Sequence, residues 1–174
     1  MLKLVLICLM LLLGGCSATG LIDCEGFYTY VPEHFTLEER YWIEESAERW
    51  NDWVGYRLLV VEPGYRPACT IHDGKTTDPP KIGSIRHPTE SITIDKEDLQ
   101  KYKDLTKHKE SAYKDVFEGV VMHELGHGLG FKHRGKNGSA LMAPAGSLDF
   151  TDIDRMQCIE LGICKTLNPP MKHD

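Results

Sequence analysis

The stretch HELGHGLGFKH, residues 123–133, decides how this chain is interpreted. It places His123 and His127 four positions apart in a segment whose apolar residues recur at helical spacing. Residues four apart in a helix lie on the same face, one turn above each other, so two imidazoles at this spacing can bind one metal ion. The carboxylate of Glu124 is then expected at the open side of the ion, without ligating it.

The end of the stretch supplies a third histidine. Gly130 stands where the helix must stop, and glycine tolerates the positive φ of a sharp reversal. That turn lets His133 approach the same ion from outside the helix. Three neutral imidazoles leave the fourth tetrahedral position to water, which is typical of catalytic zinc. We therefore expect one Zn²⁺ bound by His123, His127 and His133, with Glu124 as the general base.

Together with the segment that follows, the stretch resembles the signature of the metzincin clan of zinc peptidases, in which a Met-turn comes after HExxHxxGxxH. Here SALMAP, residues 139–144, resembles the Met-turn of the matrixin branch. The resemblance implies that Met142 forms the apolar floor beneath the zinc, whereas a plain core methionine is the alternative. Pro144 departs from the astacin and serralysin branches, in which a tyrosine stands at this position.

This resemblance implies an α+β fold, with a twisted mixed sheet, helices behind it, an active-site helix and a C-terminal helix. It also implies a zinc endopeptidase acting on peptides or proteins, with residues 33–174 as its catalytic domain. The family pairs substrate with the strand at the upper edge of the cleft, and residues 91–95 are the candidate, although a buried strand without that role fits equally. A structural zinc is left unassigned, because His72, Asp73 and His87 match the family spacing poorly.

Patterns outside the signature predict the remaining elements. Helices are expected over residues 37–54, 111–128 and 151–163, and strands over residues 56–62, 68–72, 82–86 and 91–95. The segment TLEE, residues 36–39, has the pattern of a capping box, and Gly55 ends the first helix. Residues 95–114 carry charges of both signs, which favours a solvated face over a phosphate site.

The beginning of the chain has the pattern of a targeting segment. Residues 1–15 read as a signal peptide, since Lys3 precedes ten apolar residues, too few to span a bilayer. LGGC, residues 13–16, resembles a bacterial lipoprotein box, which implies a lipid on Cys16 and membrane attachment. Ordinary signal cleavage near Ala18 is the alternative, and would give a secreted protein.

Residues 16–32 are interpreted as a tether between this anchor and the domain. By the same lipoprotein resemblance, Ser17 favours the outer membrane of a bacterial cell envelope. Four of the six cysteines remain for the folded part: Cys24, Cys69, Cys158 and Cys164. An even number in an oxidising compartment predicts two disulfides, with three pairings open. A four-cysteine zinc site lacks the usual CxxC pair, and free buried thiols are the third alternative.

The composition limits the classes of function. A chain of 174 residues with 41% hydrophobic and 26% charged residues fits one globular domain, and we expect a monomer. A net charge of −6 argues against a nucleic-acid binder. The alternative to an endopeptidase is a surface-anchored binding or adhesion module with a non-catalytic zinc site. Glu124 argues against that alternative, because a purely structural site has no use for its carboxylate.

Overall fold

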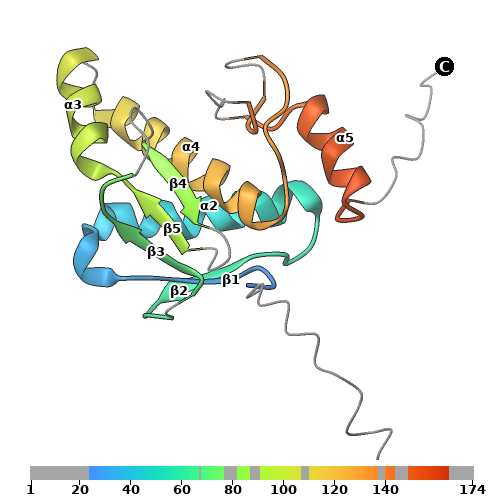
Figure 1. Cartoon of the computed structure of the whole chain (residues 1–174), viewed down its shortest axis with the longest axis horizontal. Helices are drawn as coiled ribbons and strands as arrows, with labels where there is room; N and C mark the ends of the chain where they lie inside the picture. Colours follow the sequence, from blue (N-terminus) through green and yellow to red (C-terminus); the bar gives the residue numbers. More distant parts are fainter. Residues whose placement is uncertain are drawn as a thin grey trace, which may run out of the picture.

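The computed structural model describes residues 24–66, 68–76, 82–86, 91–106, 110–136, 140–143 and 149–164. The signal peptide expected over residues 1–15, the lipidation candidate Cys16, and His87 and Pro144 lie outside these ranges. Within them the chain has an α+β architecture, as expected, with a mixed sheet covered by helices (Figure 1). No helix in these ranges combines the length and the apolar character needed to cross a membrane.

The sheet has the strand order β2-β1-β3-β5-β4. Its strands are β1 (Phe27–Tyr30), β2 (Val60–Pro63), β3 (Thr70–Asp73), β4 (Gly83–Arg86) and β5 (Ser91–Ile94). The first four strands in this order run parallel, and β4 pairs with β5 in the antiparallel direction. Among the described strands, β2 and β4 therefore form the two edges. β5 lies inside the sheet, with Ile92 and Ile94 fully buried.

The interpretation of residues 16–32 as a tether is wrong where it covers β1. Phe27–Tyr30 pairs with β2 on one side and β3 on the other, and Tyr28 is fully buried. Aromatic residues and threonine favour strands, but four residues beside Gly26 give too short a signal to identify without their partners. The folded part therefore includes Cys24 and begins well before residue 33.

The helices supply the layer that covers the sheet. These are η1 (Pro32–His34), α2 (Leu37–Val54), α3 (Lys96–Thr106), α4 (Glu110–Gly128) and α5 (Asp152–Glu160). The bounds of α2 match the prediction, and its capping box is present: Glu39 N donates to Thr36 Oγ1, and Thr36 N donates to Glu39 Oε2. Gly55 ends the helix at a φ of 84°.

Residues 95–114 form more than the solvated face that their charges indicated. α3 occupies most of this segment, and its first turns carry ion pairs from Lys101 to Glu97 and to Asp98. Pairs at these spacings support a helix that has little apolar surface. Charge alternation was therefore a signal for a helix as well as for exposure.

α2, α3 and α4 are joined through one buried carboxylate. Glu39 accepts hydrogen bonds from Tyr113 Oη at 2.7 Å, on α4, and from Lys96 Nζ at 2.7 Å, at the start of α3. Burial alone would raise the pKa of the Glu39 carboxyl, but the hydrogen bonds from Lys96, Tyr113 and the Thr36 backbone hold this pKa below its usual value. Trp50 also ties α2 to α4, because its indole donates to Met122 O at 3.0 Å.

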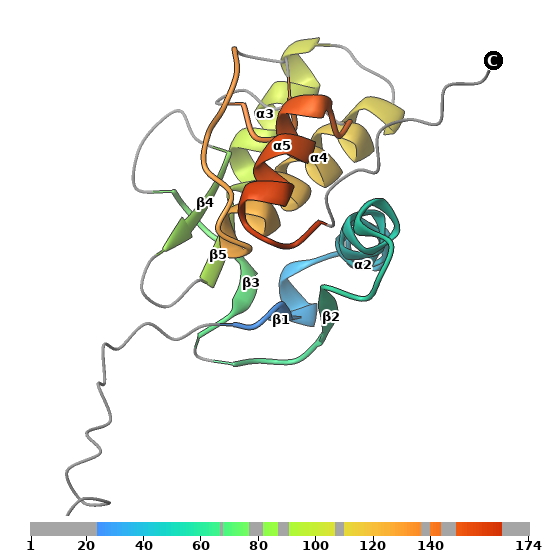
Figure 2. The same ribbon diagram turned by 90° about the vertical axis from the view of Figure 1, so that its right-hand side faces the viewer.

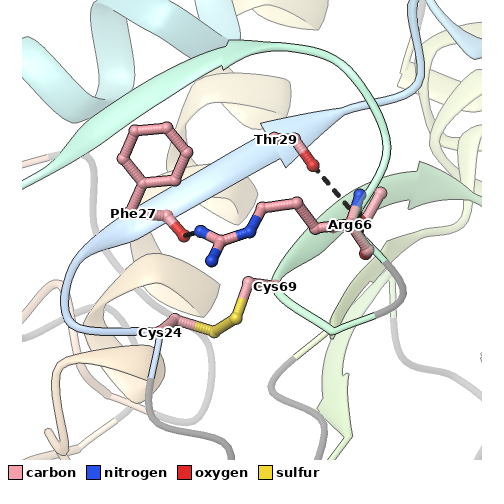
Figure 3. The surroundings of a disulfide bond; sticks show 6 residues. Cys24, Phe27, Thr29, Arg66 and Cys69 are labelled. Atoms are coloured by element: carbon pink, nitrogen blue, oxygen red, sulfur yellow. Dashed lines mark hydrogen bonds between the residues drawn. A yellow bond between two sulfur atoms is a disulfide. The ribbon is translucent and has the colours of Figure 1, made fainter.

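Two disulfides are present, as expected, and the structure selects their pairing. Cys24 bonds to Cys69, which joins the chain before β1 to the chain before β3 (Figure 3). The Arg66 guanidinium lies over the Phe27 ring beside this bond, 5.0 Å from its centroid. The second bond joins Cys158 to Cys164 and closes the C-terminal end of α5.

The two disulfides are expected to differ in their effect on stability. A cross-link removes more entropy from the unfolded chain when its loop is longer, and the sequence separations are 45 and 6. We predict that replacing Cys24 and Cys69 by alanine lowers the free energy of unfolding by about 4 kcal/mol. The same replacement of Cys158 and Cys164 should lower it by about 2 kcal/mol. Urea denaturation measures both values, and an equal loss in the two pairs would contradict the prediction.

Candidate metal centre

Three histidine side chains converge on one point at the end of α4. The Nε2 atoms of His123 and His127 are 3.1 Å apart, and His133 Nε2 lies 3.0 Å from the first and 3.1 Å from the second. These three form a group that can hold a metal ion, as the sequence spacing predicted. Bonds of about 2.0–2.1 Å in a tetrahedral site separate the ligand nitrogens by roughly 3.3 Å, close to the separations seen here.

Backbone carbonyls fix the orientation of two of the rings. His123 Nδ1 donates to Leu141 O at 2.8 Å, and His127 Nδ1 donates to Phe131 O at 2.8 Å. With the proton on Nδ1 in a neutral ring, the Nε2 atom of each carries a lone pair. The lone pairs of His123 and His127 face each other at 3.1 Å and repel, but both would be attracted to a cation bound between them. The donor set therefore fits a metal ion.

The protonation state of the first histidine suits a metal ligand. Burial lowers the pKa of His123 to about 4, and the neighbouring His127 and His133 also lower it. The hydrogen bond to Leu141 opposes this shift but does not cancel it. His123 is therefore neutral near pH 7, and no proton has to leave before its nitrogen can bind an ion.

The turn that brings His133 to the site is the one expected at Gly130. This residue has a φ of 90°, and Phe131 N donates back to Gly126 O at 2.9 Å. The helix therefore closes through a left-handed residue, where glycine carries no Cβ penalty. The chain then reverses, and His133, which is exposed, faces the two histidines of α4.

Glu124 lies on the same helix as two of the histidines. It follows His123 directly and is 6% exposed, so its carboxylate is held inside the protein rather than in bulk water. The edge strand β4 passes alongside it, because a Cβ added to Gly83 would meet the Glu124 side chain. Glu124 therefore places a buried carboxylate on the helix that carries His123 and His127, against the edge strand β4.

Met142 packs against α4 at Gly126, which lies between His123 and His127 in the sequence. Met142 is 1% exposed. A Cβ built on Gly126 would lie only 2.5 Å from Met142 Sδ, too close for both atoms to fit. Trp50 approaches the same glycine from α2. The absence of a side chain at Gly126 is therefore what allows Met142 and Trp50 to reach the helix backbone between the two histidines.

One aspartate holds the segment that carries Met142. Asp154, on α5, is 1% exposed and accepts hydrogen bonds from the backbone N–H groups of Leu141 and Met142, both at 3.1 Å. It also accepts from the backbone N–H and hydroxyl of Thr151, both at 2.9 Å. Thr151 followed three residues later by Asp154 has the pattern of a helix cap, and the structure has this capping box, but nothing in the sequence pointed to the contact of Asp154 with the Met142 segment.

Asp154 is linked to the metal centre through one peptide unit. The Leu141 carbonyl accepts the Nδ1 proton of His123, and the N–H of the same peptide unit, that of Met142, donates to Asp154 Oδ1 at 3.1 Å. Arg134, which follows His133, donates its N–H to Met142 O at 2.8 Å, and its guanidinium pairs with Glu160 at 2.6 Å. α5 lies beside the C-terminal part of α4 (Figure 2), so one helix supports both sides of the site.

The structure corrects the expected edge strand beside the site and assigns no second metal site among the described residues. Residues 91–95 were the candidate for the strand at the edge of the cleft, but β5 lies between β3 and β4, and β4 occupies that edge. The order of strands depends on pairing between distant segments, which local patterns do not reveal. Among the described residues, His72 contacts Thr93 Oγ1 at 3.0 Å, and the only group that can hold an ion is His123, His127 and His133.

Comparisons with known proteins add no assignment: no protein-family model matches the chain, and no curated protein matches it.

The role of Asp154 leads to a prediction that separates it from a simple helix cap. We expect Asp154→Asn to lower the free energy of unfolding by about 2–3 kcal/mol, because the amide presents a donor to N–H groups that need an acceptor. The same change should weaken metal binding about 10–100-fold, since Leu141 no longer fixes His123 as firmly. Urea denaturation and chelator competition measure the two effects.

Asp152→Asn is the matched control, because Asp152 lies in the same first turn of α5 but is exposed. We expect this control to change stability by less than about 0.5 kcal/mol and to leave metal affinity unchanged. Equal metal affinities in the two variants would show that Asp154 does not support the site.

Proposed function

We propose that this protein is a zinc-dependent endopeptidase. The single observation that carries the proposal is the convergence of three imidazole nitrogens at 3.0–3.1 Å, with the buried Glu124 on the same helix. Three neutral nitrogen ligands favour Zn²⁺, a borderline ion that binds imidazole and accepts tetrahedral geometry. A site with three protein ligands leaves a position open, as catalytic zinc requires.

The chemistry divides between the ion and one side chain. When bound, Zn²⁺ polarises the scissile carbonyl and lowers the pKa of its water to about 7. Glu124 accepts the proton that this water loses on attack and passes it to the leaving amine. His123 and His127 keep their Nδ1 protons on backbone carbonyls, so neither competes with Glu124 as the base.

The substrate is proposed to bind along β4 rather than β5. Asp95 N donates to Ile82 O at 2.7 Å, which identifies a hydrogen-bonded pair next to the start of β4. Because such pairs alternate along antiparallel strands, the N–H and C=O groups of Gly83 and Ile85 point away from β5, toward the open edge. An extended peptide can therefore add to β4 beside Glu124.

Replacing the proposed base tests the mechanism. We predict that Glu124→Ala binds one Zn²⁺ per chain with wild-type affinity, because the carboxylate is not a ligand. Cleavage of a peptide library should fall by at least about 100-fold, in the range that general-base catalysis contributes. Metal content and product release by mass spectrometry give the two readouts. Wild-type activity in this variant contradicts the mechanism, and a wild-type chain that binds zinc but cleaves nothing favours the adhesion module instead.

A second prediction tests the use of β4. Ile85→Pro removes a backbone N–H that points to the edge, where proline is tolerated. We expect KM to rise about three- to tenfold, as the loss of one hydrogen bond to substrate would give, with little change in kcat. Ser84→Ala is the control, because it keeps every backbone donor. An unchanged KM for Ile85→Pro in a folded protein would exclude pairing at this position.

A further inference from the structure

β4 approaches α4 most closely at Gly83. A Cβ on this residue would lie 2.9 Å from Glu124 Oε1 and 3.0 Å from Glu124 Cγ, and 2.6 Å from Val120 Cγ1. Carbon atoms do not come this close to other atoms without displacement, so a side chain at position 83 would force its neighbours to move. The Glu124 side chain thus fills space that only glycine leaves free.

The backbone conformation does not explain a glycine here. Gly83 lies within a regular strand, and its φ is outside the left-handed region that favours glycine, in contrast to the φ of 90° at Gly130. Glycine inside a strand weakens it and often marks the close approach of another group. At Gly83 the group that approaches is the carboxylate proposed as the general base.

We propose that Gly83 is a positioning residue for Glu124. This inference rests on the proposed function, since it assigns Gly83 a role in the same reaction. Val120 is β-branched and sits on α4, where its side chain is held in one rotamer, while the side chain of Glu124 has three rotatable bonds. A Cβ at position 83 therefore displaces the carboxylate more readily than the helix. A displacement of about 1 Å can lower a rate about 100-fold.

The contact is tested first by stability, without any need for activity. Urea midpoints are measured for Gly83→Ala with and without Glu124→Ala, all in a Val120→Ala background that removes the tightest other contact. We expect Gly83→Ala to lower the midpoint when Glu124 is present, and to lower it less or to raise it with Glu124→Ala. Equal shifts in the two backgrounds would overturn the inference, as would failure of the Gly83→Ala protein to fold even with both other substitutions present.

Kinetics then test the positioning role. We expect Gly83→Ala to lower kcat about 10–100-fold. The same loss is expected when the Gly83→Ala, Val120→Ala double variant is compared with Val120→Ala alone. KM should stay within about threefold, and zinc stoichiometry should be unchanged, because no ligand has moved. Gly74→Ala is the matched control: a Cβ on Gly74 lies 3.4 Å from its nearest neighbour, an ordinary contact, so kcat should stay within about twofold.

Two outcomes are distinguishable in this design. A wild-type chain without peptidase activity would overturn the proposed function, while the stability measurements would still decide whether Gly83 and Glu124 are coupled. A cleaving wild-type enzyme in which Gly83→Ala retains kcat would overturn the role of Gly83 and leave the proposed function standing.

Discussion

The constraint on which this structure depends is the convergence of three imidazole side chains. Their Nε2 atoms lie 3.0–3.1 Å from one another because the surrounding protein holds the rings there. Two come from one turn of α4, and the third is returned by the reversal at Gly130. Carbonyls of Leu141 and Phe131 fix the rings from behind. The three histidines can hold a metal ion, and an ion bound only by the folded chain would also stabilise it.

The support for this convergence comes from elements that are distant in the sequence. Asp154 binds the backbone of residues 141 and 142, and that backbone in turn orients His123. The buried charge of Asp154 is compensated by four donors, which makes it expensive to disturb. α5 therefore supports the candidate metal centre through Asp154 and Glu160, although it contributes no ligand.

The grouping of the three histidines could be predicted from the sequence better than their surroundings could. His123, His127 and His133 follow from spacing and from one left-handed glycine, both of which are local properties. The position of β1 and the placement of β4 at the edge could not be predicted in this way. Each depends on pairing with other segments, and four-residue strands such as β1 carry too little periodicity to be recognised alone.

The contrast between local properties and contacts with distant segments also applies within residues 123–133. The signature HExxHxxGxxH allows any residue at the positions of Gly126 and Gly128. In the structure, however, a side chain at Gly126 would overlap with Met142, and one at Gly128 would overlap with the Tyr28 hydroxyl. Tyr28 belongs to β1, the strand that the sequence placed in a tether. Gly126 therefore leaves room for Met142 and Trp50, and Gly128 leaves room for the sheet through Tyr28. Both glycines reflect contacts with distant segments, whereas Gly130 reflects the local turn.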